Sequence, residues 1–533
     1  MGKRKNKYFD VHGPVFWPAS ILIVVFIVTT LVVGKPMETV FQNIQEGISD
    51  YAGWFLTTST NVFLVFCIVV GFSKLGAIRL GGRSAEPEFS RGAWFAMLFS
   101  AGMGIGIIFW GVAEPMYHYL SPPQPKATQA ELLEQAMGFS YLHWGMHAWG
   151  IYALVGLALA FFTFSRKLPL TIRSVFYPLL KEKVYGWPGD VIDVLAVMAT
   201  LFGLATSLGF GVQQVSSGLS YLLGWPDTVT TQVLLILGIT LVATVSVVLG
   251  IDKGVKTLSE VNIRIAAVFL IFMLAVGPTL FIFDSLTQNI GYYLQNFFQI
   301  SFWTEAYAPD AKAGWQNSWT VFYWAWWISW SPFVGMFIAR VSKGRTVREF
   351  VMGVLLVPTL LTFLWMTTFG GSGLWVEINN PGLIGQNVMD NVSTSLFVLL
   401  EQFPLTTITS AIGVILVINF FVTSSDSGSL VIDSITAGGK LDAPVGQRVF
   451  WALTEGGVAA VLLIGGGLTA LQTAAITTGL PFTFVLILMM FSLYKGLMNE
   501  HGRNMQKDKE TDMAKYDARL RNIVEKRKQK EKS

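Results

Sequence analysis

The sequence predicts an all-α integral membrane protein with about twelve transmembrane helices. Of its 533 residues 53% are hydrophobic and only 13% are charged, whereas a soluble globular protein carries about 25% charged residues. The apolar residues are gathered into runs of roughly 20, the length at which a helix crosses the hydrocarbon core of a bilayer. Because a backbone in lipid must satisfy its own hydrogen bonds, these runs are interpreted as helices.

The apolar runs divide the chain into three regions. An N-terminal segment, 1–16, precedes a transmembrane domain, 17–495, and a basic tail, 496–533, follows it. Two loops, near 285–315 and 375–400, mix aromatic with polar residues, so we expect surface helices there. In chain order the predicted spans cover roughly residues 17–38, 52–74, 92–116, 137–165, 190–223, 231–250, 260–283, 317–340, 350–370, 406–430, 447–465 and 470–495.

Positive charge alternates from loop to loop. Lys and Arg residues gather before the first span and after the second, fourth, sixth, eighth and tenth. The loops between these carry only Lys35, Lys126 and Lys312. Because loops rich in Lys and Arg stay on the cytoplasmic side, both termini are predicted to be cytoplasmic, which requires an even number of spans.

The tail differs from the rest of the chain because it is dense in Lys, Arg and Glu. Met513, Tyr516, Leu520 and Ile523 recur at helical spacing, which predicts an amphipathic helix. One interpretation is a solvated polar tail. The other is a basic helix that contacts anionic lipid heads of the inner leaflet, where each Lys or Arg contributes about 1 kcal/mol.

Several classes of protein are excluded by what the spans contain. The single cysteine, Cys67, allows no disulfide framework. The five histidines have no metal-ligand spacing and no nucleophile–base pair is evident, so an enzyme is not predicted. A channel would need a polar lining or rings of like charge, which the apolar spans do not offer. The basic residues lie in loops beside spans, so the net charge of +4 does not indicate nucleic-acid binding.

Three alternate glycines lie in the middle of the third span, in Ala101-Gly102-Met103-Gly104-Ile105-Gly106. Glycine weakens a helix, so we expect an unwound stretch whose bare N–H and C=O groups face a cavity. The alternative is close helix packing through Gly102 and Gly106, which form a GxxxG pair. Gly104 lies on the opposite face and fits only the first interpretation.

Aromatic residues form a stripe in the middle of the eighth span. Trp326, Trp330 and Phe333 follow i, i+4, i+7 spacing, and Trp327 adjoins them. Membrane tryptophans usually lie at span ends. A trimethylammonium group has charge but no N–H, so aromatic faces are its natural partners, at about 0.5–2 kcal/mol each. The stripe therefore predicts either a cationic-ligand box or simple core packing.

The fourth and tenth spans add two further candidate groups. Trp144, Trp149 and Tyr152 supply more aromatic rings, for a ligand or for packing. In the tenth span four hydroxyls surround Asp426, more than the usual bonding of a hydroxyl to the preceding turn requires. Na⁺ prefers oxygen, so hydroxyls here would suit it together with carbonyls of an unwound helix.

The order of these spans predicts an internal repeat. If the third span opens one unit of five helices, 92–283, and the eighth opens another, 317–495, the odd number inverts the second unit. Two inverted five-helix repeats with broken first helices form the architecture of many secondary transporters, which bind their substrate at the midplane.

The motif Trp326-Trp327-Ile328-Ser329-Trp330-Ser331-Pro332-Phe333, which continues through Ala339-Arg340-Val341-Ser342-Lys343-Gly344-Arg345-Thr346, resembles the betaine/choline/carnitine transporter family. The resemblance covers nearly all of the spans. It implies the leucine-transporter-type fold, a homotrimer in a bacterial cell membrane, and osmoprotective uptake of a quaternary-ammonium zwitterion, foremost glycine betaine, by Na⁺ symport.

The resemblance also implies residue roles. The substrate cage is expected to comprise Trp326, Trp327, Trp330, Trp144, Trp149 and Tyr152, with Gly104, Gly106 and Phe333 beside them. The main sodium site is expected at Ala101, Met103, Phe420, Thr423 and Ser424.

Three positions bear on the details. Choline-importing relatives carry Asp where Gly106 stands, so Gly106 favours a zwitterion. Thr200, with Ser207, is the candidate for a second ion site, but Leu204 occupies the place of a second threonine. Arg264 lies near the position of an arginine that replaces sodium in sodium-independent exchangers. A carnitine-type antiporter, or uptake of choline or ectoine, therefore remains the alternative.

Overall fold

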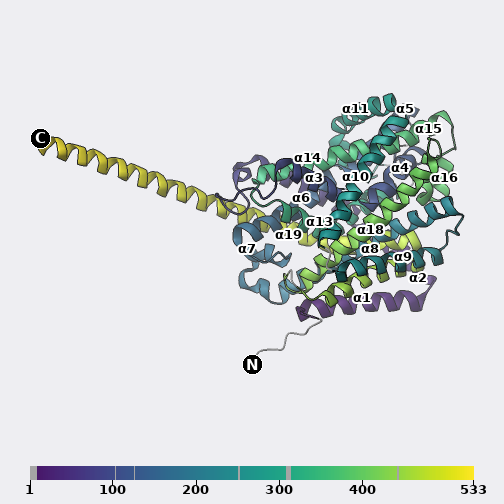
Figure 1. Ribbon diagram of the computed structural model, residues 1–533, viewed down its shortest axis with the longest axis horizontal. Coiled ribbons are helices and arrows are strands. Elements are labelled where there is room, and N and C mark those ends of the chain that lie inside the picture. Colours follow the sequence, from purple (N-terminus) through teal and green to yellow (C-terminus); the bar gives the residue numbers. More distant parts are fainter. Residues whose placement is uncertain are drawn as a thin grey trace.

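The computed structural model describes residues 9–102, 104–124, 127–249, 252–307, 314–440 and 443–532. This described part is a bundle of helices without a β-strand; one isolated bridge pairs Arg79 with Thr346. Figure 1 shows the bundle and a last helix that projects far beyond it. The prediction of an all-α protein is confirmed.

The helices follow one another with short connections. The first half of the described chain forms α1 (Gly13–Val33), α2 (Pro36–Phe72), α3 (Arg91–Gly102), α4 (Ile105–Leu120), α5 (Gln129–Trp144), α6 (Met146–Ala160), α7 (Tyr177–Leu180), α8 (Trp187–Leu223), α9 (Val229–Leu249) and α10 (Asp252–Val276). The second half forms α11 (Thr279–Gln295), α12 (Phe297–Ser301), α13 (Phe322–Val341), α14 (Val347–Met366), α15 (Ser372–Asn379), α16 (Gly385–Asp390), α17 (Ser395–Leu400), α18 (Thr406–Thr436) and α19 (Val445–Lys532).

Nine helical segments of the described chain are long and apolar enough to cross a membrane. The remaining predicted spans are not counted separately, because of how the helices are divided or composed. The third is divided between α3 and α4, the eighth is the aromatic helix α13, and the eleventh and twelfth share α19. The chain is thus a multi-pass membrane protein, while the number twelve stays a prediction.

Helix α19 contains the last two predicted spans and the tail. Its backbone leaves the helical conformation at Gly466 and Gly467, and Gly467 has a φ of 55°, a left-handed value that glycine adopts at no steric cost. The helix then continues through the tail to Lys532. The predicted amphipathic tail helix is present, and its apolar residues Met513 and Tyr516 are exposed.

The third and fourth spans are both interrupted at glycines. α3 ends at Gly102 and α4 begins at Ile105, with Gly104 extended at a φ of −166°. Met103 lies outside the described residues. α5 and α6 meet at Gly145, where a Cβ atom would collide with the carbonyl oxygen of Tyr141. The predicted break in the third span is therefore present.

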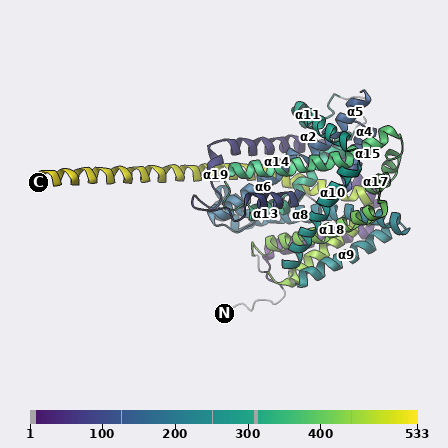
Figure 2. The same cartoon turned by 45° about the horizontal axis from the view of Figure 1, so that its top comes forward.

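The first described residues and the tail helix lie at the same end of the bundle as the basic loops. Arg79 donates to the carbonyl of Gly344 at 2.6 Å, and Arg83 pairs with Asp508 at the start of the projecting helix. Near the N-terminus, His12 Nε2 lies 2.7 Å from Asp190 Oδ1. Figures 1 and 2 show the C-terminal helix leaving from this end. The side of the membrane that it faces stays a prediction.

Short helices cover the opposite end. They are α11 and α12 in one connection and α15, α16 and α17 in the other, close to the two loops in which surface helices were predicted. Glu377 fixes the second group, because its buried carboxylate accepts backbone N–H bonds from Gly382, Ile384 and Gly385 at 2.7–3.0 Å.

A buried ion pair holds the start of α8, and its loss should destabilise the fold. Arg173 Nε lies 2.5 Å from Asp193 Oδ2, and the Asp193 side chain is fully buried. Arg173→Met should lower the free energy of unfolding by about 3–5 kcal/mol, because it leaves a buried charge without its partner. The measurement is thermal unfolding of the detergent-solubilised protein. Arg264→Met is the control, since Arg264 is 76% exposed; equal shifts would contradict the prediction.

Candidate functional site

The aromatic residues of α13 and of the α5–α6 region form one cluster. The rings of Trp326 and Trp327 stack with centroids 4.5 Å apart, and Trp144 meets Trp327 edge-on at 4.9 Å. Tyr152 lies 6.3 Å from Trp327 and 6.5 Å from Trp330. Trp330 alone of these rings is partly exposed, while the others are buried. The structure therefore brings the predicted box together.

Hydrogen bonds from neighbouring helices fix the box. Trp327 Nε1 donates to the carbonyl of His143 at 2.8 Å, close to the point where α5 ends. Pro332 lies inside α13, which runs through it without a break. Proline removes the N–H that would bond the carbonyl four residues earlier. The hydroxyl of Ser331 supplies a donor instead, at 2.7 Å from the Ile328 carbonyl.

Gly104 and Gly106 of the broken third span lie against the edges of the tryptophan rings. A Cβ atom at Gly106 would stand 2.8 Å from Trp326 Cη2 and 3.0 Å from Trp144 Cη2, and one at Gly104 would stand 3.7 Å from Trp330 Cη2. Any side chain at position 106 would push Trp326 and Trp144 apart. Gly106 thus permits the ring packing itself, in addition to the predicted preference for a zwitterion.

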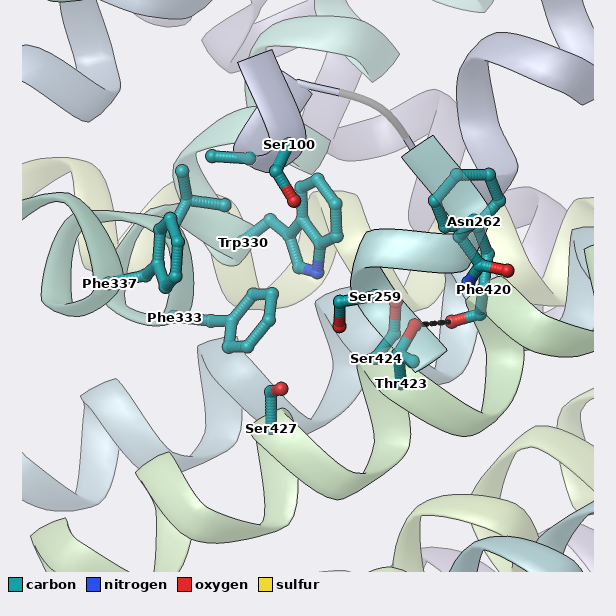
Figure 3. Close-up of a pocket in the computed structure, with 12 residues that line it drawn as sticks. Ser100, Ser259, Asn262, Trp330, Phe333, Phe337, Phe420, Thr423, Ser424 and Ser427 are labelled. Carbon is teal, nitrogen blue, oxygen red and sulfur yellow. Dashed lines mark hydrogen bonds between the residues drawn. The ribbon is translucent and has the colours of Figure 1, made fainter. Parts of the chain in front are cut away.

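A cavity of about 110 Å³ lies beside this cluster and joins it to α18 (Figure 3). Trp330 and Phe333 of α13 form one wall. The candidate sodium ligands that line it are Ala101, Phe420, Thr423 and Ser424; the fifth, Met103, lies outside the described residues. The Thr423 hydroxyl donates to the Asn419 carbonyl at 2.9 Å, so its lone pairs remain for a cation.

The cavity extends toward the end of the bundle that carries the termini. A second hollow of about 330 Å³ shares Phe333, Phe337 and Ser427 with the first, and it reaches Glu88 and Arg340. Arg340 is exposed at the end of α13. A route therefore leads from Trp330 to the basic end of the bundle.

Comparison with known proteins agrees with this geometry. The family model "BCCT, betaine/carnitine/choline family transporter" matches residues 14–502. The chain belongs to this family.

Curated relatives extend over nearly the whole chain. A glycine betaine/proline/choline transporter of Vibrio parahaemolyticus is 48% identical, over 92% of this chain and 91% of its own length. A glycine betaine/proline/choline/ectoine transporter of the same organism is 49% identical, over 92% and 88%. The glycine betaine transporter OpuD of Bacillus subtilis is 43% identical, over 93% and 96%. The predicted family is confirmed, and with it a bacterial-type multi-pass transporter.

The candidate second ion site of this BCCT transporter, Thr200 and Ser207, stays a prediction. The hydroxyls of Thr200 and Ser207 donate to carbonyls of their own helix, at 2.7 and 3.2 Å, as hydroxyls in helices usually do. The two residues are about two turns apart, and neither lines the cavity at Trp330. Trp149 also lies apart from that cavity, with its ring against Tyr152 at 5.4 Å.

Arg264 does not reach the candidate sodium site. Its side chain is 76% exposed and pairs only loosely with Glu260, at 3.7 Å. Two positions earlier, on another face of α10, Asn262 lines the cavity, and both of its side-chain polar atoms are buried without a hydrogen-bond partner in the described structure. The neutral amide of Asn262, and not the guanidinium group of Arg264, therefore faces the candidate sodium site.

Sequence reasoning missed the buried carboxylate of Glu114. Its Oε1 accepts from His143 Nδ1 at 2.7 Å and from His118 Nε2 at 3.2 Å. Its Oε2 accepts from Trp144 Nε1 at 2.6 Å and from the Tyr323 hydroxyl. The four donors occupy the acceptor capacity of the carboxylate. Ionisable residues inside spans are commonly functional, and that signal would have singled out Glu114.

The histidine spacing had indicated no metal ligands, yet the fold brings three such groups together. Ligand atoms of Glu114, His118 and His143 lie within 4.8 Å of one another. Hydrogen bonds join Glu114 to both histidines, and His143 Nε2 lies 3.0 Å from the Thr320 hydroxyl. The arrangement is that of a hydrogen-bonded network that positions Trp144.

Glu114→Gln should destabilise the protein, because an amide has one acceptor oxygen and turns its N–H donors toward other donors. We expect the free energy of unfolding to fall by about 1–3 kcal/mol for each donor left unsatisfied. Thermal unfolding measures this, with Glu46→Gln at an exposed position as the control. A variant with unchanged stability would remove Glu114 from its assigned role.

Proposed function

We propose that this BCCT transporter imports a quaternary-ammonium zwitterion, foremost glycine betaine, by Na⁺ symport. The observation that carries the proposal is the cavity between α13 and α18. Its one wall offers the aromatic faces of Trp330 and Phe333, and its other wall offers the oxygens of Thr423 and Ser424. An aromatic face suits a methylated ammonium group, and oxygens suit Na⁺.

The indole N–H groups provide a partner for the other end of the substrate. Trp326 Nε1 and Trp330 Nε1 are buried and have no hydrogen-bond partner in the described structure. Buried donors are normally paired, so these two are available to a carboxylate. A zwitterion would thus place its methyl groups against the rings and its carboxylate against the N–H groups. The names of the relatives include the zwitterions glycine betaine, proline and ectoine, and they also include choline, a cation without a carboxylate.

Sodium would couple to the substrate through the broken third span. Ala101 belongs to α3, next to the break, whereas Thr423 and Ser424 belong to α18. An ion held by both helices stabilises one arrangement of the break, and Gly104 of that break lies against Trp330. Because both ligands would favour the same arrangement, the binding of each strengthens that of the other.

The rival proposal is a sodium-independent exchanger. It would need a fixed cation, such as a guanidinium group, in the place of sodium. Arg264 is turned to the surface, and the neutral Asn262 lines the cavity instead. This placement favours sodium coupling over exchange.

The proposal also covers the location, assembly and physiological role of the protein. The protein acts in osmoprotection in a bacterial cell membrane, as a homotrimer with both termini in the cytoplasm. The route from Trp330 then opens toward the cytoplasm. The tail helix projects away from the bundle, so it would have to bend near its start for its exposed apolar residues Met513, Tyr516, Leu520 and Ile523 to meet the inner leaflet, where its basic residues attract anionic lipids.

Uptake of labelled glycine betaine into proteoliposomes tests the coupling. We expect accumulation with an inward sodium gradient and none when potassium replaces sodium. Thr423→Val keeps the shape and removes the oxygen, so it should raise the sodium concentration for half-maximal uptake at least tenfold, about 1.4 kcal/mol. Ser427→Ala, in the same cavity, is the control and should leave this concentration unchanged. Uptake that ignores sodium but needs internal substrate would establish the exchanger.

Trp330→Leu should weaken betaine binding at least tenfold, because it removes the aromatic face that borders the cavity; about 1.4 kcal/mol is within the range of one cation–π contact. Equilibrium binding to the purified protein measures the change. Phe337→Leu, further along the same wall, is the control and should change the affinity far less. Unchanged affinity in a folded Trp330→Leu variant would remove Trp330 from the cage.

A further inference from the structure

A second buried carboxylate lies behind the candidate sodium site and has no part in the mechanism above. Glu455, in the first half of α19, is fully buried. Its Oε2 accepts a hydrogen bond from the Ser425 hydroxyl at 3.0 Å, and its Oε1 has no partner in the described structure. Among the described residues, no Lys, Arg or His side chain forms an ion pair with it.

The described surroundings of Glu455 hold no cationic partner for its carboxylate. A Cβ atom at Gly428 of α18 would lie 3.3 Å from Glu455 Oε1, and the side chain of Leu204 from α8 fills the space beside it. Helix α9, which packs against α19, has no titratable residue between Val229 and Leu249. From α18 the titratable group that acts on Glu455 is Asp426, which is itself bonded to the Ser246 hydroxyl at 3.1 Å. About two turns beyond Asp426 in α18, Asp433 Oδ2 lies 3.4 Å from Arg448 Nε.

This environment selects a proton as the ligand. An ionised carboxylate without a counter-charge is very unfavourable in a medium of low dielectric constant, so it takes up a proton or a cation. A metal ion needs several oxygens around it, whereas Oε1 lies close to Gly428 and has no hydrogen-bond partner in the described structure. A proton needs only the carboxylate itself. Asp426, as a neighbouring acid, adds repulsion to the ionised form.

Glu455 is also placed where transport would change its surroundings. Ser425, its hydrogen-bond partner, follows Thr423 and Ser424 directly in α18, and these two line the cavity. A movement of α18 relative to α19 that opens or closes the cavity would therefore alter the contact between Ser425 and Glu455. When water reaches Glu455, its O–H bond breaks, the electron pair stays on the carboxylate and the proton passes to water.

We propose that Glu455 is a proton-binding site of the transport cycle, so that a proton moves with the substrate and sodium. The proposal rests on the proposed function, because it needs a transported substrate. It adds a second coupling ion and assigns it to a carboxylate on α19, away from the aromatic box.

Proteoliposomes that contain a pH-sensitive dye test this proposal. Potassium is kept equal on both sides with valinomycin, so that the membrane voltage cannot drive protons. Glycine betaine and sodium are then added outside, and betaine uptake and lumenal pH are recorded in the same vesicles. We expect the lumen to acidify in proportion to the betaine taken up. The ratio of protons to betaine should fall to the background of protein-free vesicles in Glu455→Gln and stay unchanged in the exposed Glu46→Gln.

The wild-type protein alone can overturn the proposal. Sodium-driven betaine uptake without acidification would exclude a coupled proton, whether or not the glutamine variant folds. The same proton ratio in Glu455→Gln would exclude Glu455 as its site. If no betaine is taken up at all, the proposed function fails instead, and the two failures are therefore distinguishable. As a second measurement, an inward proton gradient at equal sodium should drive betaine accumulation in the wild type.

Discussion

Glu114 accepts hydrogen bonds from four side chains on three helices, and the aromatic half of the site depends on this carboxylate. His118 shares α4 with it, His143 and Trp144 come from α5, and Tyr323 comes from α13. Because the group is buried, each donor that it lost would be left in a medium of low dielectric constant. The network thereby fixes the indole of Trp144, and Trp144 in turn packs edge-on against Trp327.

The packing of the rings places a constraint on the backbone beside them. Trp326 and Trp144 approach Gly106 so closely that a Cβ atom would have to displace them. In the described arrangement the rings of the box touch one another. Of the predicted box residues, only Trp330 and Phe333 line the cavity. A ligand held by the whole box would therefore have to separate the rings, and the cavity on the basic side marks the route by which it would leave. This is the behaviour expected when one half of a transporter rocks against the other around a fixed site.

Sequence patterns predicted those features that depend on one helix alone. The spacing of Trp326, Trp330 and Phe333 on α13, the glycine break before Ile105 and the hydroxyls of α18 all follow from residues near one another in the chain. The helical phase between elements could not be predicted in this way. Arg264 and Asn262 are two residues apart, and only the packing of α10 decides that the amide faces the cavity and the guanidinium faces outward.

Features that join distant segments were missed for the same reason. The donors to Glu114 lie up to 209 positions away in the sequence, and Glu455 meets Ser425 from a different helix. The case of Pro332 is local: α13 stays unbroken because the Ser331 hydroxyl donates to the Ile328 carbonyl, a compensation that a rule about proline alone does not contain. Thr200 and Ser207 lie about two turns apart on α8, and neither lines the cavity at Trp330.

An electron-microscopy or crystallographic map of the protein with glycine betaine and sodium tests the central claim most directly. We predict density for the trimethylammonium group between the rings of Trp144, Trp326, Trp327 and Trp330, and density for an ion beside Thr423 and Ser424. Betaine density confined to the hollow at Glu88 and Arg340, with the four rings still in contact, would contradict it.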